Sequence, residues 1–218
     1  VDFAVNELGV ERVAVLHDKE DYGKGLATYA QQYLTEAGVE VAIFEGITAG
    51  AVDYSAIINR VAAADVDAVF WGGYHPEASK LVQQGRDRGL LVPFISGDGV
   101  KDDTFIDVAG SAAEGVYATA PTDTTSNPLA IQAAEEHVAE YGVEYGAFFL
   151  NAYAATLALV NAIEVAGSTD YDAIVGALTS SYVDTPLGSI SFTAEGEPIG
   201  VGFSVYQVQD GAYVQISD

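Results

Sequence analysis

Three side chains with complementary chemistry, Tyr22, Tyr74 and Asp98, each follow a short apolar segment of the sequence. Parallel strands place their carboxyl ends at one edge of a sheet, and ligands bind in the crevice outside that edge. A carboxylate can pair with an ammonium group, while a phenol ring offers an apolar wall with a polar tip. The sequence therefore predicts that two phenols and a carboxylate converge on one small molecule. The three apolar segments read as β-strands at 12–17, 67–71 and 93–96.

The first 120 residues alternate predicted strands and helices with short connections, which favours an α/β fold with a doubly wound parallel sheet. Further strands are expected at 39–44 and 115–120, and helices at 3–8, 23–37, 54–64, 76–88 and 103–109.

The pattern changes after Pro121, where a polar crossing at 122–128 leads into a run of helices and then into strands without helices. The turn Gln209-Asp-Gly211 between the last two strands is typical of a β-hairpin. A change of pattern followed by a return to strands predicts two lobes joined by crossings. The expected helices are 129–141, 148–166 and 171–180, and the expected strands are 188–192, 201–208 and 212–216.

Composition excludes several classes of function. The chain has 218 residues, 50% of them hydrophobic, a formal net charge of −24 and no Cys. All eight Lys and Arg lie between Arg12 and Lys101, so the surface repels phosphate backbones, and nucleic-acid binding is not expected. The lack of Cys removes disulfide and zinc–thiolate chemistry. No apolar run approaches the roughly 18 residues that a membrane span needs, which predicts a soluble chain.

Other candidate motifs have structural explanations that fit better. Gly23-Lys-Gly25 lacks the remaining residues of a dinucleotide or P-loop motif, so a tight turn into a helix is expected instead. The acids Asp18, Glu20 and Asp21 are expected to lie in a solvated loop of a very acidic chain. No Gly-x-Ser-x-Gly motif or Cys is present to supply a nucleophile, which disfavours an enzyme.

The three histidines do not have the spacing of a metal site. His17 and His75 end different predicted strands and can approach the crevice, but hydrogen-bonded loop histidines are the better explanation. His137 stands among glutamates on an expected solvated helix face. No metal or cofactor is therefore expected. The alternative for Tyr22 and Tyr74 is a surface loop that carries aromatic residues by chance.

Several motifs in order resemble the branched-chain amino-acid-binding proteins of ABC importers, which are type I periplasmic solute-binding proteins. The resemblance rests on 17–27, 44–50, 72–77 and 113–115, and extends to 151–155 and the closing strands. It implies a two-lobed type I periplasmic-binding fold that closes on a free amino acid and docks on a membrane permease. Tyr22 and Tyr74 match aromatic ligand-contacting positions, and Asp98 matches the acid that pairs with the α-ammonium group.

The resemblance also implies boundaries and two departures. Residues 1–121 with 201–218 match the C-terminal ligand-binding lobe, and 122–200 match the remaining part of the N-terminal lobe. Leucine-type members carry Glu where this chain has Asp98, which bears on the side chain that the site prefers. The family has a long stretch before the equivalent of Val1, so we expect a fragment, a cleaved chain or a partly resolved one that binds weakly by itself.

The implied role is an extracytoplasmic solute-binding protein, periplasmic or extracellular, with lipid anchoring as one option. It would take a branched-chain or other apolar amino acid, act without a cofactor, and be a monomer at full length. The alternative is an amino-acid or amide sensor domain of a signalling protein on the same fold.

The acidic composition, with few Lys and much Ala, Gly and Val, suggests a protein adapted to high salt. The expected result is a lower melting temperature in low salt than in molar salt, because salt screens the self-repulsion of the carboxylates. Thermal unfolding followed by circular dichroism measures this. A melting temperature that does not change between the two conditions would contradict the hypothesis.

Overall fold

The computed structural model describes residues 1–124 and 126–217, and these separate into two compact units. Unit 1 consists of Val1–Ala120 and Ser204–Asp218, and unit 2 consists of Pro121–Phe203. Thr125, in the expected crossing, and Asp218, at the end of the expected C-terminal lobe, lie outside the described residues. The assignment of the two units to lobes of a ligand trap stays a prediction.

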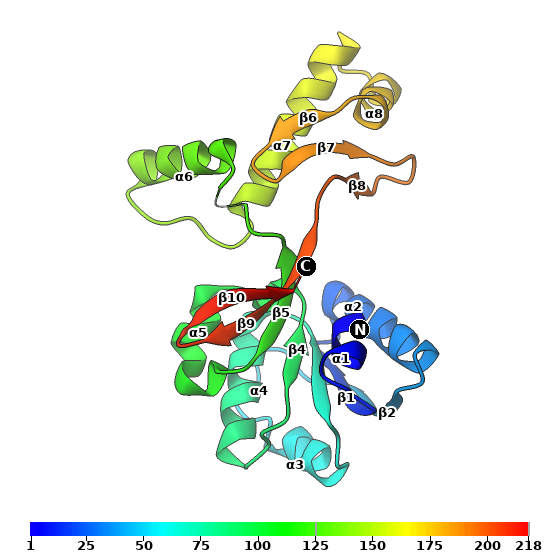
Figure 1. The fold of residues 1–218 in the computed structure, drawn as a ribbon, viewed down its shortest axis with the longest axis vertical. Coiled ribbons are helices and arrows are strands. Elements are labelled where there is room, and N and C mark those ends of the chain that lie inside the picture. The colour runs from blue at the N-terminus through cyan, green and yellow to red at the C-terminus, as the bar shows by residue number, and fades with distance from the viewer. Residues whose placement is uncertain (125, 218) are drawn as a thin grey trace. The chain divides into compact units, whose positions relative to one another are not determined.

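Within the described residues, unit 1 is built on a seven-stranded sheet with the order β10-β9-β5-β4-β3-β1-β2 (Figure 1). Strand β1 pairs in parallel with β2 and β3, and β4 pairs in parallel with β3 and β5, whereas β9 and β10 are antiparallel. The predicted α/β class with a mostly parallel sheet is confirmed. The strands are β1 Arg12–His17, β2 Glu40–Gly46, β3 Ala68–Gly72, β4 Phe94–Ser96, β5 Tyr117–Pro121, β9 Phe203–Gln209 and β10 Ala212–Ser217.

Helices cover both faces of this sheet, as a parallel sheet requires. Alternate residues of β1 point to opposite faces, so Val13 and Val15 pack with α1 and α2, whereas Ala14 and Leu16 pack with α3, α4 and α5. The helical elements are α1 Asp2–Asn6, α2 Asp21–Glu36, α3 Ser55–Ala63, α4 His75–Asp87 and α5 Asp103–Ala109, with 3-10 turns η1 Asp98–Val100 and η2 Gly110–Ala113.

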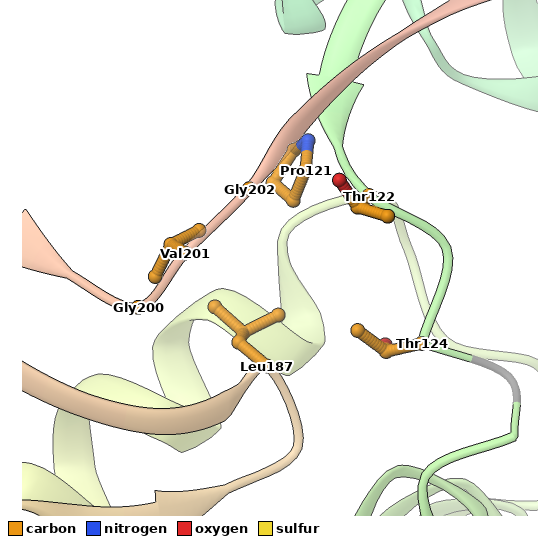
Figure 2. Close-up of a pocket in the computed structure, with 7 residues that line it drawn as sticks. All are labelled: Pro121, Thr122, Thr124, Leu187, Gly200, Val201 and Gly202. Atoms are coloured by element: carbon orange, nitrogen blue, oxygen red, sulfur yellow. The ribbon is translucent and has the colours of Figure 1, made fainter. Parts of the chain in front are cut away.

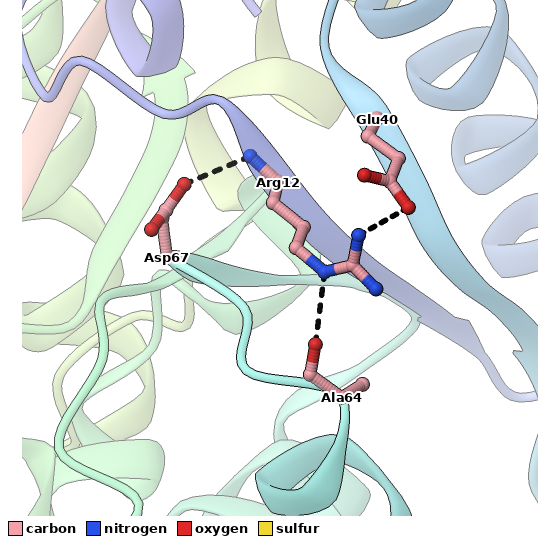
Figure 3. Close-up of polar contacts among 4 residues, drawn as sticks. All are labelled: Arg12, Glu40, Ala64 and Asp67. Atoms are coloured by element: carbon pink, nitrogen blue, oxygen red, sulfur yellow. Dashed lines mark hydrogen bonds and ion pairs between the residues drawn. The ribbon is translucent and has the colours of Figure 1, made fainter.

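Arg12 ties the amino ends of three strands together (Figure 3). Its Nε donates to the carbonyl oxygen of Ala64 over 2.9 Å, and its guanidinium forms an ion pair with Glu40 at the start of β2. The Asp67 carboxylate accepts the Arg12 amide over 2.8 Å. These contacts fix the edge of the sheet opposite the carboxyl ends of the strands.

The hairpin between β9 and β10 is held by a carboxylate. Asp210 and Gly211 have φ values of 52° and 78°, as a two-residue Asp-Gly hairpin turn requires. The Glu114 carboxylate accepts the Asp210 amide over 3.1 Å and the Gly211 amide over 2.7 Å. The hairpin predicted at this turn is confirmed.

Unit 2 contains helices and a small antiparallel sheet, which is three-stranded in the part that the structure describes, with the order β6-β7-β8. Strands β6 and β8 were not expected from the sequence, because they are only a few residues long. Asn127 caps α6 by accepting the Leu129 amide, and its side-chain amide donates to the carbonyl oxygens of Thr185 and Pro186. The elements are α6 Pro128–Tyr141, α7 Phe149–Ala166, α8 Tyr171–Ser180, β6 Val183–Thr185, β7 Gly188–Phe192 and β8 Pro198–Ile199.

Helix α7 corrects the expectation that no apolar run approaches the length of a membrane span. Among the described residues, it is the one helix long and apolar enough to cross a bilayer by length and composition alone. Ala154, Ala158 and Ala162 form its buried stripe, one turn apart. A single helix of this kind is weak evidence for a span, since core helices of soluble proteins have the same composition.

The packing around Arg86 yields a stability prediction. Its half-buried guanidinium donates to the carbonyl oxygens of Leu90 and Val92 over 2.7 and 2.9 Å, and lies 5.5 Å from the centre of the Phe94 ring. Arg86→Met leaves both carbonyls without this donor, so we expect a loss of about 1–3 kcal/mol in the free energy of unfolding. Urea denaturation measures it.

The matched control is Arg88→Met. Arg88 lies two residues further on and makes an exposed hydrogen bond to the Gln84 carbonyl oxygen. Removal of such an exposed contact should change stability by less than about 0.5 kcal/mol. Equal losses in the two variants would show that Arg86 does not hold the loop between α4 and β4.

Candidate functional site

The candidate site lies where the chain changes direction across the sheet. From β1 the chain continues to β2 on one side, whereas β3 lies on the other side of β1. Such a switch point leaves a crevice at the carboxyl ends of the strands. Tyr22 follows β1 and Tyr74 follows β3, so both come from the two strands that flank the switch point. Asp98 follows β4, the next strand along.

The structure brings all three predicted site residues together. The Tyr22 hydroxyl donates to Oδ1 of Asp98 over 2.8 Å, although the two residues are 76 positions apart. The rings of Tyr22 and Tyr74 are in contact, with centroids 5.0 Å apart and planes inclined by 37°. Tyr22 and Asp98 are partly buried, while 43% of Tyr74 is exposed. The three side chains thus form one surface of two phenol rings and a carboxylate.

Burial and the neighbouring carboxylate determine the protonation state of Tyr22. Burial and the neighbouring carboxylate of Asp98 raise the pKa of Tyr22, so its hydroxyl remains a donor. Among the residues that the structure describes, Oδ2 of Asp98 accepts no hydrogen bond and Asp98 forms no ion pair. Asp98 therefore presents an oxygen that an incoming cationic group can use.

A close backbone approach between Gly23 and Gly72 lies next to both tyrosines. A methyl group at Gly72 would overlap the carbonyl oxygen of Gly23 in the first turn of α2. Because neither residue has a side chain, the amino end of α2 can pack directly on the end of β3. Tyr22 adjoins Gly23 on one side of this contact, and Gly73 and Tyr74 follow Gly72 on the other.

Glycines on both sides of Asp98 make room for the rings. A Cβ atom at Gly99 would lie 3.1 Å from Tyr74 Cδ1 and 3.2 Å from Tyr22 Cε1. A Cβ atom at Gly97 would lie 3.0 Å from the Tyr22 hydroxyl. Sequence reasoning selected Asp98 and missed both glycines, although the Gly-Asp-Gly spacing was a signal that a backbone segment passes close to other groups.

Asp18 corrects the expectation of a solvated acidic loop. Its side chain is only 3% exposed, and its Oδ1 accepts the Glu20 amide over 2.9 Å. A Cβ atom at Gly73 would lie 2.9 Å from Asp18 Oδ2, so this carboxylate fills the space between the β1–α2 and β3–α4 connections. Asp18 thus packs against the β3–α4 connection, which carries Tyr74. Glu20 and Asp21 are exposed as expected.

The glycine motif at 23–25 is also different from what was expected. Helix α2 begins at Asp21, so Gly23 and Gly25 lie inside the helix and do not form a turn before it. Close packing against Gly72 explains Gly23. A Cβ atom added at Gly25 would meet nothing within 4 Å, so nothing in the packing explains this second glycine.

Two of the three histidines, His17 and His137, are hydrogen-bonded or packed against rings. His17 is 6% exposed and its Nδ1 accepts the Lys19 amide over 3.1 Å, while burial lowers its pKa. His75 begins α4. His137 is half-buried, with ring centroids 4.7 Å from Phe149 and 4.9 Å from Tyr141. The glutamates around it are exposed, so the helix face is solvated as expected, but His137 itself is partly covered. The described residues contain no group of three or more side chains able to hold a metal ion.

Unit 2 has a cavity of its own, about 250 Å³ in volume. Figure 2 shows residues from two segments of the chain, 121–124 and 200–202, around it, and Leu187 from the turn between β6 and β7. The Thr122 amide donates to the Gly202 carbonyl oxygen over 2.9 Å, which joins the two segments. None of the described residues that line the cavity is charged. These residues are Pro121, Thr122, Thr124, Leu187, Gly200, Val201 and Gly202.

Comparison with known proteins identifies relatives along nearly the whole chain. The profile of the periplasmic binding protein family matches residues 1–212. The leucine-, isoleucine-, valine-, threonine- and alanine-binding protein of Pseudomonas aeruginosa is 36% identical over 195 residues, which cover 89% of this chain and 52% of that protein. Leu/Ile/Val-binding protein homolog 2 of Brucella abortus is 38% identical over 206 residues, which cover 93% and 55%.

A solved structure is similar in fold. The crystal structure of the leucine-binding protein LivK from Thermotoga maritima superposes with a TM-score of 0.89 at 29% identity, over 99% of this chain and 62% of that one. The chain spans about half the length of the relatives that it matches in sequence.

The close approach of α2 to β3 gives a prediction about the architecture of the site. Gly72→Ala should force the backbone at Gly23 away, because the added methyl group would overlap a carbonyl oxygen and not a flexible side chain. We expect a loss of about 1–3 kcal/mol in the free energy of unfolding, from strain in a packed interior. Urea denaturation measures the loss, and near-ultraviolet circular dichroism follows the Tyr22–Tyr74 contact.

Gly25→Ala is the matched control within α2. A methyl group there meets nothing within 4 Å, so the substitution should stabilise the helix by about 0.5–1 kcal/mol. If Gly72→Ala were as stable as the unsubstituted protein, with an unchanged aromatic spectrum, the glycine contact would not determine the spacing of the rings.

Proposed function

The chain belongs to the periplasmic binding protein family, whose members are solute-binding proteins and not enzymes, and from this premise we propose that it captures a free amino acid for an ABC importer. The proposed ligand is a branched-chain or other apolar amino acid. Relatives named for binding leucine, isoleucine and valine support this choice. In the full-length protein, 1–121 with 201–218 would form one lobe of the trap, and 122–200 would contribute to the other.

The observation that carries the proposal is the hydrogen bond between Tyr22 and Asp98 with the Tyr74 ring beside it. Tyr22 occupies one carboxylate oxygen of Asp98 and leaves Oδ2 for a charge-assisted hydrogen bond from an ammonium group. This pairing would strengthen as ligand binding excludes water. The faces of Tyr22 and Tyr74 would contact the hydrocarbon part of the ligand.

Binding followed by closure would present a distinct form of the protein to a membrane permease. The ligand stabilises the closed form only to the extent that it binds that form more tightly than the open one. The family places such proteins in the periplasm or outside the cell. Attachment through a lipid and a monomeric state at full length are further parts of this proposal.

The decisive test is Asp98→Asn in the full-length protein, with leucine as the probe. Loss of the anionic partner of a desolvated ammonium group should weaken binding by about 2–5 kcal/mol, which is roughly 30-fold or more in Kd. Isothermal titration calorimetry measures it. Asp98→Ala should abolish measurable binding.

Asp103→Asn provides a control with the same change of charge. Asp103 is exposed in the first turn of α5, five residues from Asp98, and should leave the Kd for leucine within a factor of about two. Unchanged leucine affinity in the Asp98 variants would refute the proposed role of the carboxylate. Comparable losses at the two positions would show an effect of overall charge instead of a specific contact.

A further inference from the structure

The turn that carries Asp98 is held by the C-terminal hairpin. The hydroxyl of Tyr213, on β10, donates to the carbonyl oxygen of Val100 over 2.6 Å, and the two residues are 113 positions apart. Val100 is the last residue of η1, the short turn that begins at Asp98. The same carbonyl oxygen accepts the Asp102 amide over 2.8 Å. Tyr213 thus contacts the end of the turn opposite the carboxylate.

The turn is short, and its backbone next to the carboxylate consists of glycines. Asp98 to Val100 form a single 3-10 turn, closed by a hydrogen bond of 3.1 Å from the Lys101 amide to the Asp98 carbonyl oxygen. Gly97 and Gly99 flank the carboxylate and have the widest choice of backbone conformation. The Val100 side chain is 1% exposed and belongs to the main core, so it anchors one end of the turn.

A cation–π contact also joins the end of the turn to the hairpin. The Lys101 ammonium lies 4.3 Å from the centre of the Tyr206 ring and 5.9 Å from that of Tyr213. An ammonium group over an aromatic face is attracted by the ring quadrupole. Lys101 directly follows the turn, so two consecutive residues contact the hairpin: Val100 through the Tyr213 hydroxyl and Lys101 through the rings.

Hydrogen bonds to residues 114–116 hold the hairpin in place. Glu114 holds its turn through the amides of Asp210 and Gly211. Backbone hydrogen bonds of 2.9 Å join Val208 to Gly115 and to Val116. Burial, followed by the charges of Asp102 and Asp103, raises the pKa of Tyr213, so its hydroxyl stays protonated and able to donate.

We propose that Tyr213 is a positioning residue for ligand recognition, which sets the orientation of Asp98 by holding the carbonyl oxygen of Val100. This inference rests on the proposed function of Asp98 as the partner of an ammonium group. Tyr213 acts through the turn and does not contact the ligand. A binding carboxylate must be held in place within a fraction of an ångström, and the glycines around Asp98 cannot supply that rigidity themselves.

The test compares two ligands in the full-length protein, leucine and 4-methylpentanoate, which keeps the hydrocarbon chain and the carboxylate but lacks the ammonium group. Tyr213→Phe keeps the ring beneath Lys101 and removes only the hydroxyl. We expect the Kd for leucine to rise about fivefold, the effect of one hydrogen bond. The Kd for 4-methylpentanoate, titrated at millimolar concentration by tryptophan fluorescence, should stay unchanged.

Tyr54→Phe is the matched control. Tyr54 is 4% exposed, and its hydroxyl also donates to a backbone carbonyl oxygen, that of Thr48, over 3.1 Å. Its removal should change stability by a similar amount without affecting discrimination between the two ligands. Amide hydrogen exchange at Lys101 and Asp102, measured without ligand, should become at least several-fold faster in Tyr213→Phe and stay unchanged in Tyr54→Phe.

The outcomes separate the two proposals. If the Kd values of leucine and 4-methylpentanoate rise equally in Tyr213→Phe, or neither changes, the positioning role is overturned while the proposed function stands. If the unsubstituted protein binds neither leucine nor another apolar amino acid, the proposed function is refuted, and so is this inference. A rise confined to leucine, with faster exchange in the turn, supports the positioning role.

Discussion

The site depends on one steric constraint, the direct contact between the backbone of α2 at Gly23 and the end of β3 at Gly72. Any side chain at either position would push the helix away from the sheet. Because Tyr22 and Tyr74 adjoin these glycines, the distance between their rings follows from the contact between the backbones. The two phenols are thus positioned by a backbone contact at the point where the strand order reverses.

The second feature of the site is the charge of Asp98 and the partners available to it. The hydrogen-bond partner of Asp98 is a hydroxyl group and not a cation. Several cations of unit 1 are used elsewhere: Arg12 and Arg60 pair with glutamates, and Arg86 and Lys80 bind loop carbonyls. Most acids of this chain, which has a net charge of −24, form no ion pair within the described residues, so what distinguishes Asp98 is its place beside the rings of Tyr22 and Tyr74.

Much of unit 1 was predictable, because its signals are local. The alternation of apolar runs and helical patterns indicated the strands and helices, and the parallel arrangement then placed Tyr22, Tyr74 and Asp98 at one edge. The Asp-Gly turn at 210–211 likewise depends only on neighbouring residues. For these features, the physical cause lies within a few residues of the feature itself, so the sequence is sufficient.

The features that sequence reasoning missed have causes far away along the chain. Asp18 looked like a member of a solvated acidic cluster, and it is buried because the close approach of β3 encloses it. His137 looked exposed, and it packs against the ring of Phe149 from the next helix. Periodicity tells which face of an element is buried but not which partner covers it. The same argument applies to the hydrogen bond from Tyr213 to Val100. A strand predicted from the sequence only as one half of a hairpin supports the turn on which the proposed ligand contact depends.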